Sequence, residues 1–157
     1  MTIVYLLTYK GNSNLIKEDM VKKVVEDVKE ISLAHVLFFD GSYRKSHDAA
    51  SGGIALYESQ GKLVCNKGFK VDAHSNNEEE YCTLELGLHI CLKHGVRRLC
   101  IKGDALLIVK HILRVWKSKN PSLKDMCFRI KNLLKQFEAW RIRHIERALN
   151  EEAHDAA

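Results

Sequence analysis

The stretch His35-Val36-Leu37-Phe38-Phe39-Asp40, followed by Gly41, decides the fold of this chain. Its β-branched and aromatic residues predict a strand over residues 36–40, and Asp40 stands where that strand ends. A second apolar run, Leu99-Cys100-Ile101-Lys102-Gly103-Asp104, repeats the pattern and also ends on a carboxylate. Carboxylates at the ends of two strands of one sheet can converge on a single point.

A third carboxylate comes from the run Glu78-Glu79-Glu80, in the first turn of a predicted helix. Three converging carboxylates repel one another unless a divalent cation lies between them, so the pattern predicts a metal-dependent phosphoryl-transfer site. Each acid taken alone also has a simpler explanation: Asp40 as a turn residue, Glu80 as an acid favoured by the helix dipole, and Asp104 as an N-cap. The residues alone do not distinguish Glu80 from Glu78 and Glu79.

Hydrophobic periodicity and turn residues predict the remaining elements. Strands are expected at 36–40, 52–57, 62–71, 96–102 and 139–147, and helices from Asn76 or Asn77 to His94, at 104–117 and at 123–137. Residues 41–51 are predicted to be a loop, residues 120–122 a break, and Asn150 the start of a terminal helix. Short connections make the first three strands antiparallel, whereas the helix before the fourth strand allows a parallel crossover. The chain is therefore predicted to be an α/β domain with a five-stranded mixed sheet flanked by helices.

Residues 1–34 differ from the rest of the chain. A short strand at 3–9 and a helix at 15–31 are predicted there, and neither carries recognisable chemistry. We interpret this segment as an N-terminal extension, either a tether to an upstream domain or an accessory packing element, that precedes a domain at 35–157.

The formal net charge of +5 is unevenly distributed. Residues 110–135 hold eight Lys or Arg and one acid, Asp125, so the rest of the chain is slightly acidic. A basic segment beside an acidic cluster is typical of a nuclease, because the cations hold the phosphate backbone while the acids hold metal at the cleaved bond. The alternative interpretation is a solvated helix face.

Composition excludes several classes of protein. No run approaches the roughly 18 apolar residues needed to span a bilayer, and residues 1–7 do not form a signal peptide. The five cysteines match no zinc-site or disulfide spacing, so we expect reduced thiols. These features predict an intracellular protein of the cytosol, nucleus or an organelle interior, not secreted, with no membrane partner and acting as a monomer.

Several short blocks of sequence together resemble one known family. They are Phe39-Asp40-Gly41-Ser42, Gly52-Gly53-Ile54-Ala55-Leu56-Tyr57, Asn76-Asn77-Glu78-Glu79-Glu80-Tyr81, Lys102-Gly103-Asp104 and Asn150-Glu151-Glu152-Ala153-His154. With this order and spacing the chain resembles the ribonuclease H domain family over residues 35–157, and most of all its plant reverse-transcriptase-like branch. The resemblance implies the ribonuclease H-like fold for the predicted sheet and helices.

The resemblance also implies a function and a catalytic set. It selects Glu80 from the three glutamates and assigns Asp40, Glu80 and Asp104 to a site for two Mg²⁺ ions, with Mn²⁺ as the other candidate. The implied reaction is endonucleolytic hydrolysis of the RNA strand of RNA–DNA hybrids. The family's fourth acid corresponds here to His154, while Asp155 lies one residue later. His154 would then act as a ligand or proton shuttle, and Asp155 is the alternative fourth ligand.

Contacts to the hybrid are expected at both ends of the site. Asn76 and Asn77 match the family's groove-reading amides, and Gly41 and Ser42 are candidates for contact with 2′-hydroxyl groups. Trp116 with Lys117 would contact the DNA strand, or Trp116 would serve only in packing.

Two other functions remain open from the sequence. The replacement of the fourth acid by His154 favours a nucleic-acid-binding module with weak or lost catalysis. The chain would alternatively be a domain of a retroelement polyprotein, with residues 1–34 as the tether.

Overall fold

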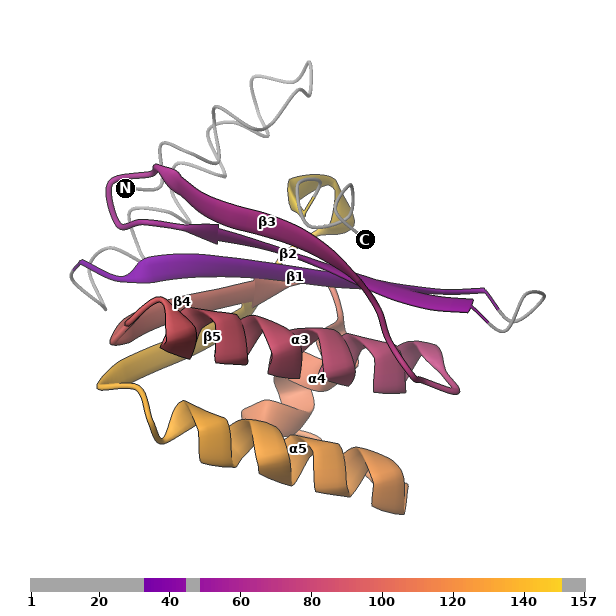
Figure 1. The fold of residues 1–157 in the computed structure, drawn as a ribbon. Helices are drawn as coiled ribbons and strands as arrows, with labels where there is room; N and C mark the ends of the chain where they lie inside the picture. The colour runs from indigo at the N-terminus through magenta and orange to yellow at the C-terminus, as the bar shows by residue number, and fades with distance from the viewer. Residues whose placement is uncertain (1–32, 45–48, 151–157) are drawn as a thin grey trace.

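The computed structural model describes residues 33–44 and 49–150. Its five strands form one sheet in the order β3-β2-β1-β4-β5 (Figure 1). β1 pairs antiparallel with β2, and β2 with β3, whereas β4 lies parallel to both β1 and β5. The strands are β1 (His35–Arg44), β2 (Ala49–Tyr57), β3 (Leu63–Lys70), β4 (Arg98–Gly103) and β5 (Ala139–His144). The predicted mixed sheet with three antiparallel strands at its start is therefore confirmed.

Three helices lie on one face of this sheet (Figure 1). They are α3 (Asn76–Lys93), α4 (Leu106–Ile112) and α5 (Pro121–Leu134), and a 3₁₀ turn, η2 (Arg147–Leu149), follows β5. α3 packs against β1, β2 and α5, and α4 packs against α5 and β5. No described helix is both long enough and apolar enough to cross a membrane.

The core is divided by the two faces of the sheet, because successive side chains of a strand point to opposite sides. Leu37 and Phe39 of β1 face the helices and are fully buried with Leu84 of α3. Phe38 faces the other side, where its ring meets that of Tyr57 edge-on at 5.7 Å. β1 is therefore covered on both faces, which fixes the position of the acid that follows Phe39.

The predicted loop over residues 41–51 is wrong at both ends. β1 continues to Arg44 and β2 begins at Ala49, and Gly41 pairs with Gly52 in the ladder between them. This part of the hairpin is small and polar, so it lacks the apolar alternation that predicts a strand. β5 is shorter than predicted and ends at His144, opposite the last residue of β4.

The helix boundaries also differ from prediction. The N-cap of α3 is Ser75, whose Oγ accepts a hydrogen bond from the Glu78 amide at 3.2 Å, and not Asn76 or Asn77. α4 ends at Ile112 instead of residue 117. α5 begins at Pro121, within the predicted break, because a proline at the first helical position has no amide that needs a partner.

Some predictions fall outside the described residues: the strand at 3–9, the helix at 15–31 and the terminal helix after Asn150. The five cysteines are free, as predicted.

Candidate metal centre and active site

Two of the three predicted acids are placed by the register of neighbouring parallel strands. Phe39 of β1 is aligned with Gly103 of β4, so Asp40 and Asp104 each follow at the same level of the sheet. Asp40 lies within β1 opposite Gly53 and is only 2% exposed, which excludes its role as a turn residue. The N-cap of α4 is Ala105, so Asp104 is not the helix cap.

Gly103 allows the close approach that this register requires. A Cβ atom on Gly103 would lie 2.4 Å from Cε1 of the Phe39 ring, closer than real side chains pack. The missing side chain therefore lets Phe39 lie against the end of β4, directly before both acids.

The three consecutive glutamates of α3 point in three different directions. Glu78 links two helix starts: its carboxylate accepts the His74 amide at 2.8 Å and the Ser122 hydroxyl of α5 at 3.0 Å. Glu79 is fully buried beside Gly41, where a Cβ would stand 3.0 Å from Glu79 Oε1. Only Glu80 joins the other acids, so the geometry supplies the distinction that the residues alone did not.

Asp40, Glu80 and Asp104 form one compact cluster. One carboxylate oxygen from each lies within 4.8 Å of the others. Burial, followed by the negative charges of Asp40 and Asp104, raises the pKa of Glu80 to about 9, and a hydrogen bond from the Gly41 backbone opposes this only in part. Without a cation, Glu80 therefore retains its proton at neutral pH.

The donor set fits a hard divalent cation. All three ligands are carboxylates, which Mg²⁺ and Mn²⁺ prefer over nitrogen or sulfur ligands. The Oε2 atom of Glu80 is buried and has no hydrogen-bond partner among the described residues, so a cation would provide the missing contact. A divalent ion would also remove the repulsion that raises the pKa of Glu80.

Asn150 supports this cluster, a role that was not predicted from the sequence. It is 1% exposed, and its Nδ2 donates hydrogen bonds to the Phe39 carbonyl at 2.8 Å and to Asp104 Oδ1 at 3.1 Å. One amide group thus connects the strand that carries Asp40 with the side chain of Asp104. Its place in the Asn150-Glu151-Glu152-Ala153-His154 block was the only signal available in the sequence.

Comparisons with known proteins agree with this geometry. Residues 38–157 match the family described as reverse transcriptase-like. The ribonuclease HI of Halobacterium salinarum is 31% identical over 116 residues, which cover 74% of this chain and 58% of that protein. The chain belongs to the ribonuclease H domain family.

Solved ribonuclease H structures have the same fold. The chain superposes on ribonuclease H1 from Halobacterium salinarum with a TM-score of 0.76 and 30% identity, covering 79% of this chain and 94% of that one. The N-terminal ribonuclease H domain of a Mycobacterium tuberculosis protein gives a TM-score of 0.72 at 25% identity, covering 80% and 94%. LC11-RNase H1, solved with an RNA/DNA hybrid, gives 0.72 at 22% identity, covering 78% and 92%.

The curated relatives are longer than the matched region. YpeP of Bacillus subtilis, an uncharacterized protein, is 30% identical over 135 residues, and the match again covers 58% of the relative. The chain thus spans less than two thirds of the length of both curated relatives. They come from an archaeon and a bacterium, so assignment to the plant branch stays a prediction.

The other predicted site residues of this ribonuclease H domain lie in several places. Asn76 and Asn77 open α3, one exposed and one partly buried, in the same turn as Glu80. Gly41 directly follows Asp40 and is partly buried. Trp116 and Lys117 are exposed on the α4–α5 connection. The Ser42 side chain, His154 and Asp155 lie outside the described residues.

Proposed function

We propose that this protein is a metal-dependent endonuclease that hydrolyses the RNA strand of RNA–DNA hybrids. The observation that carries the proposal is the cluster of three carboxylates within 4.8 Å, in which burial and then the charges of Asp40 and Asp104 raise the pKa of Glu80 to about 9. A buried acidic cluster is costly to a fold, and a cation that it binds offsets that cost. The hybrid bound in the LC11-RNase H1 structure supports the choice of substrate.

Asp40, Glu80 and Asp104 would hold the metal, for which we propose two Mg²⁺ ions with Mn²⁺ as a substitute. Bound there, the metal would supply a water of lowered pKa for attack on phosphorus and positive charge for the leaving oxygen. The chain itself contributes the positions of the ligands. Strand pairing holds Asp40, Asn150 holds Asp104, and the Gly41 backbone bonds Glu80.

Substrate recognition is assigned to the rim of this cluster. Asn76 and Asn77 would donate and accept hydrogen bonds at base edges and ribose hydroxyls in the wide minor groove of the hybrid. Gly41 has no side chain, so a 2′-hydroxyl group or phosphate can approach its backbone. The RNA strand would thus be recognised by its 2′-hydroxyl groups directly beside the carboxylates.

The fourth catalytic position is proposed to be His154, with Asp155 as the alternative. Neutral imidazole is a poor ligand for Mg²⁺, so His154 would act in proton transfer or product release. A second candidate function, hybrid binding with weak or lost catalysis, is favoured by this same replacement of an acid.

A labelled hybrid incubated with the protein in Mg²⁺ or Mn²⁺ tests the proposal. We expect cleavage of the RNA strand, and we expect Asp104→Asn to reduce it by roughly a thousandfold or more, since several kcal/mol of stabilisation are lost. No cleavage in either metal, or undiminished cleavage by Asp104→Asn, would contradict the proposal. Salt-dependent binding without cleavage, with activity gained in His154→Asp, would support the binding module instead.

A further inference from the structure

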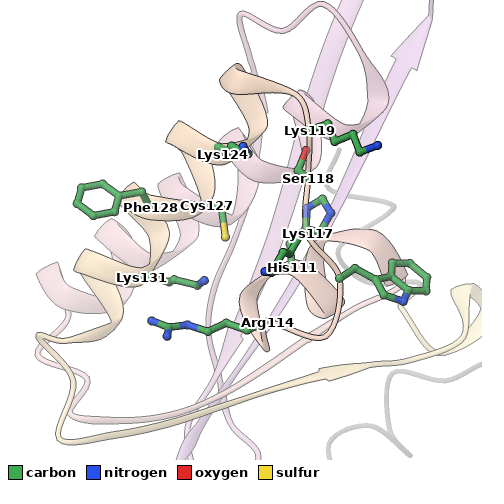
Figure 2. A pocket seen from close by; sticks show the side chains of 10 residues that line it. His111, Arg114, Lys117, Ser118, Lys119, Lys124, Cys127, Phe128 and Lys131 are labelled. Atoms are coloured by element: carbon green, nitrogen blue, oxygen red, sulfur yellow. The ribbon is translucent and has the colours of Figure 1, made fainter.

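A basic hollow, which none of the three clustered acids lines, lies between the α4–α5 connection and α5 (Figure 2). Its volume of about 600 Å³ is within the range of small-ligand clefts. Among the residues that the structure describes, no Asp or Glu lines it. The one acid of the basic segment, Asp125, pairs with Arg129 at 2.8 Å and does not line the hollow. Five cations do line it: Arg114, Lys117, Lys119, Lys124 and Lys131.

The end of α4 creates this hollow. Arg114 has φ +60°, and its amide bonds the His111 carbonyl at 3.1 Å while the Val115 amide bonds the Lys110 carbonyl at 2.9 Å. These two bonds form a Schellman motif, which usually has glycine in the left-handed position. The motif ends α4 early and directs the chain outward, so Trp116 is 46% exposed.

The buried part of the lining comes from α4 and α5. His111 and Cys127 are buried there, and the Tyr81 hydroxyl lies 2.9 Å from His111 Nδ1. Burial, followed by the positive charge of Lys131, lowers the pKa of His111. The contact between Tyr81 and His111 connects α3 with the buried side of the hollow.

The rim carries exposed aromatic rings as well as cations. Phe128 is 63% exposed on α5, and Trp116 is 46% exposed on the α4–α5 connection. Exposed rings beside Lys and Arg are the combination that single-stranded nucleic acid requires, because bases stack on the rings and phosphates meet the cations. A duplex presents its phosphates here but keeps its bases stacked within the helix.

We propose that this hollow binds an unpaired nucleotide of a single strand that extends from the hybrid. The buried floor and the exposed aromatic rings suit a base, and the five cations suit the phosphates on either side of it. The hollow is connected to the acidic cluster, because Tyr81 follows Glu80 on α3 and its hydroxyl contacts His111. The hybrid in this inference rests on the proposed function, whereas binding of the single strand does not.

Fluorescence anisotropy in EDTA, where nothing is cleaved, tests the inference. Blunt hybrids and hybrids with a single-stranded overhang are compared at one salt concentration. We expect the wild type to bind the overhang form about 5- to 10-fold more tightly. Phe128→Ala should reduce this ratio to near one and Phe128→Leu should reduce it in part. Lys135→Ala, an exposed cation of the same region outside the hollow, should leave it unchanged.

Other outcomes overturn the inference. If the two hybrids bind equally, the hollow does not bind the overhang. The same conclusion follows if the overhang preference is retained in both Phe128→Ala and the charge reversal Lys124→Glu. A free mononucleotide that binds as tightly as the overhang indicates a small-molecule pocket, and displacement of the overhang by poly-glutamate indicates a site for acidic peptides. Cleavage of the blunt hybrid in Mn²⁺ tests the proposed function separately. A failure of the proposed nuclease function is therefore distinguishable from a failure of overhang binding at the hollow.

Discussion

The molecule has two charged regions of opposite sign, and they are built in opposite ways. The acidic cluster is packed into the sheet: Asp40 is 2% exposed, and strand register, Gly103 and Asn150 fix its geometry. The basic hollow lies on irregular backbone and on one helix face, where Lys124 and Arg114 are exposed. Charges in the interior are strongly coupled to one another, whereas charges at the surface are screened by solvent. Single substitutions should therefore have large effects in the first region and small, additive effects in the second.

The largest effect is expected for Glu80→Gln. Cleavage should fall by roughly a thousandfold, because a metal ligand is lost. The metal-free protein should nevertheless become more stable at pH 7, by up to about 3 kcal/mol, because the folded carboxyl must otherwise keep a proton that the unfolded chain releases. The pKa of Glu80 is raised to about 9 in the folded state, so its contribution to stability is lost as pH rises from about 4.5 to 9. Thermal unfolding of both proteins across this range in EDTA measures the difference.

Metal addition provides the control for this prediction. Mg²⁺ or Mn²⁺ should raise the melting temperature of the wild type, because a ligand that binds only the folded state stabilises that state. The effect on Glu80→Gln should be much smaller, because this variant has lost one of the metal ligands. If the stability of the two proteins in EDTA depends on pH in the same way, the pKa of Glu80 is not raised in the folded state and the interpretation is wrong.

A smaller effect is expected for Asn150→Ala. The substitution removes both hydrogen bonds of a buried amide and should destabilise the protein by about 1–3 kcal/mol. Because Asn150 bonds Asp104 and is itself only 1% exposed, kcat and metal affinity should fall while the KM for the hybrid changes little. Asn132→Ala, an exposed asparagine on α5, is the matched control. A loss of stability with unchanged kcat and metal affinity would leave Asn150 with a purely structural role.

Helix ends show how much of the fold was predictable. Gly95 ends α3 with φ +73° and the paired bonds of a Schellman motif, and the sequence predicted that end because glycine favours this conformation. Arg114 ends α4 in the same way, at φ +60°. An arginine gives no signal for left-handed backbone, so the helix was predicted to continue to residue 117. The basic hollow could not be predicted for the same reason.

The site shows a similar limit. Asp40 and Asp104 were predictable because each closes an apolar strand, which is a local pattern. Glu80 needed the family resemblance, because the reason for its choice is tertiary: Glu78 bonds Ser122 and Glu79 is buried beside Gly41. The role of Asn150 depends on the Phe39 carbonyl, 111 residues earlier in the chain, and no local pattern reports such a contact.

The smallest effect is expected for Lys124→Ala, in the basic hollow. At moderate salt this substitution should weaken binding of the overhang hybrid only about two- to threefold, because an exposed lysine gains little from one phosphate contact. The slope of log affinity against log salt should nevertheless become shallower by about 0.7, the value for one phosphate of a single strand. Binding isotherms at several salt concentrations measure this, with Lys135→Ala as the control and the blunt hybrid as the reference substrate.

A loss of affinity that is the same at every salt concentration would mean that Lys124 acts through packing. An equal change of slope with the blunt hybrid would mean that the hollow contacts the duplex. The hollow would then be part of the surface that binds the hybrid, and not a separate site for an unpaired strand.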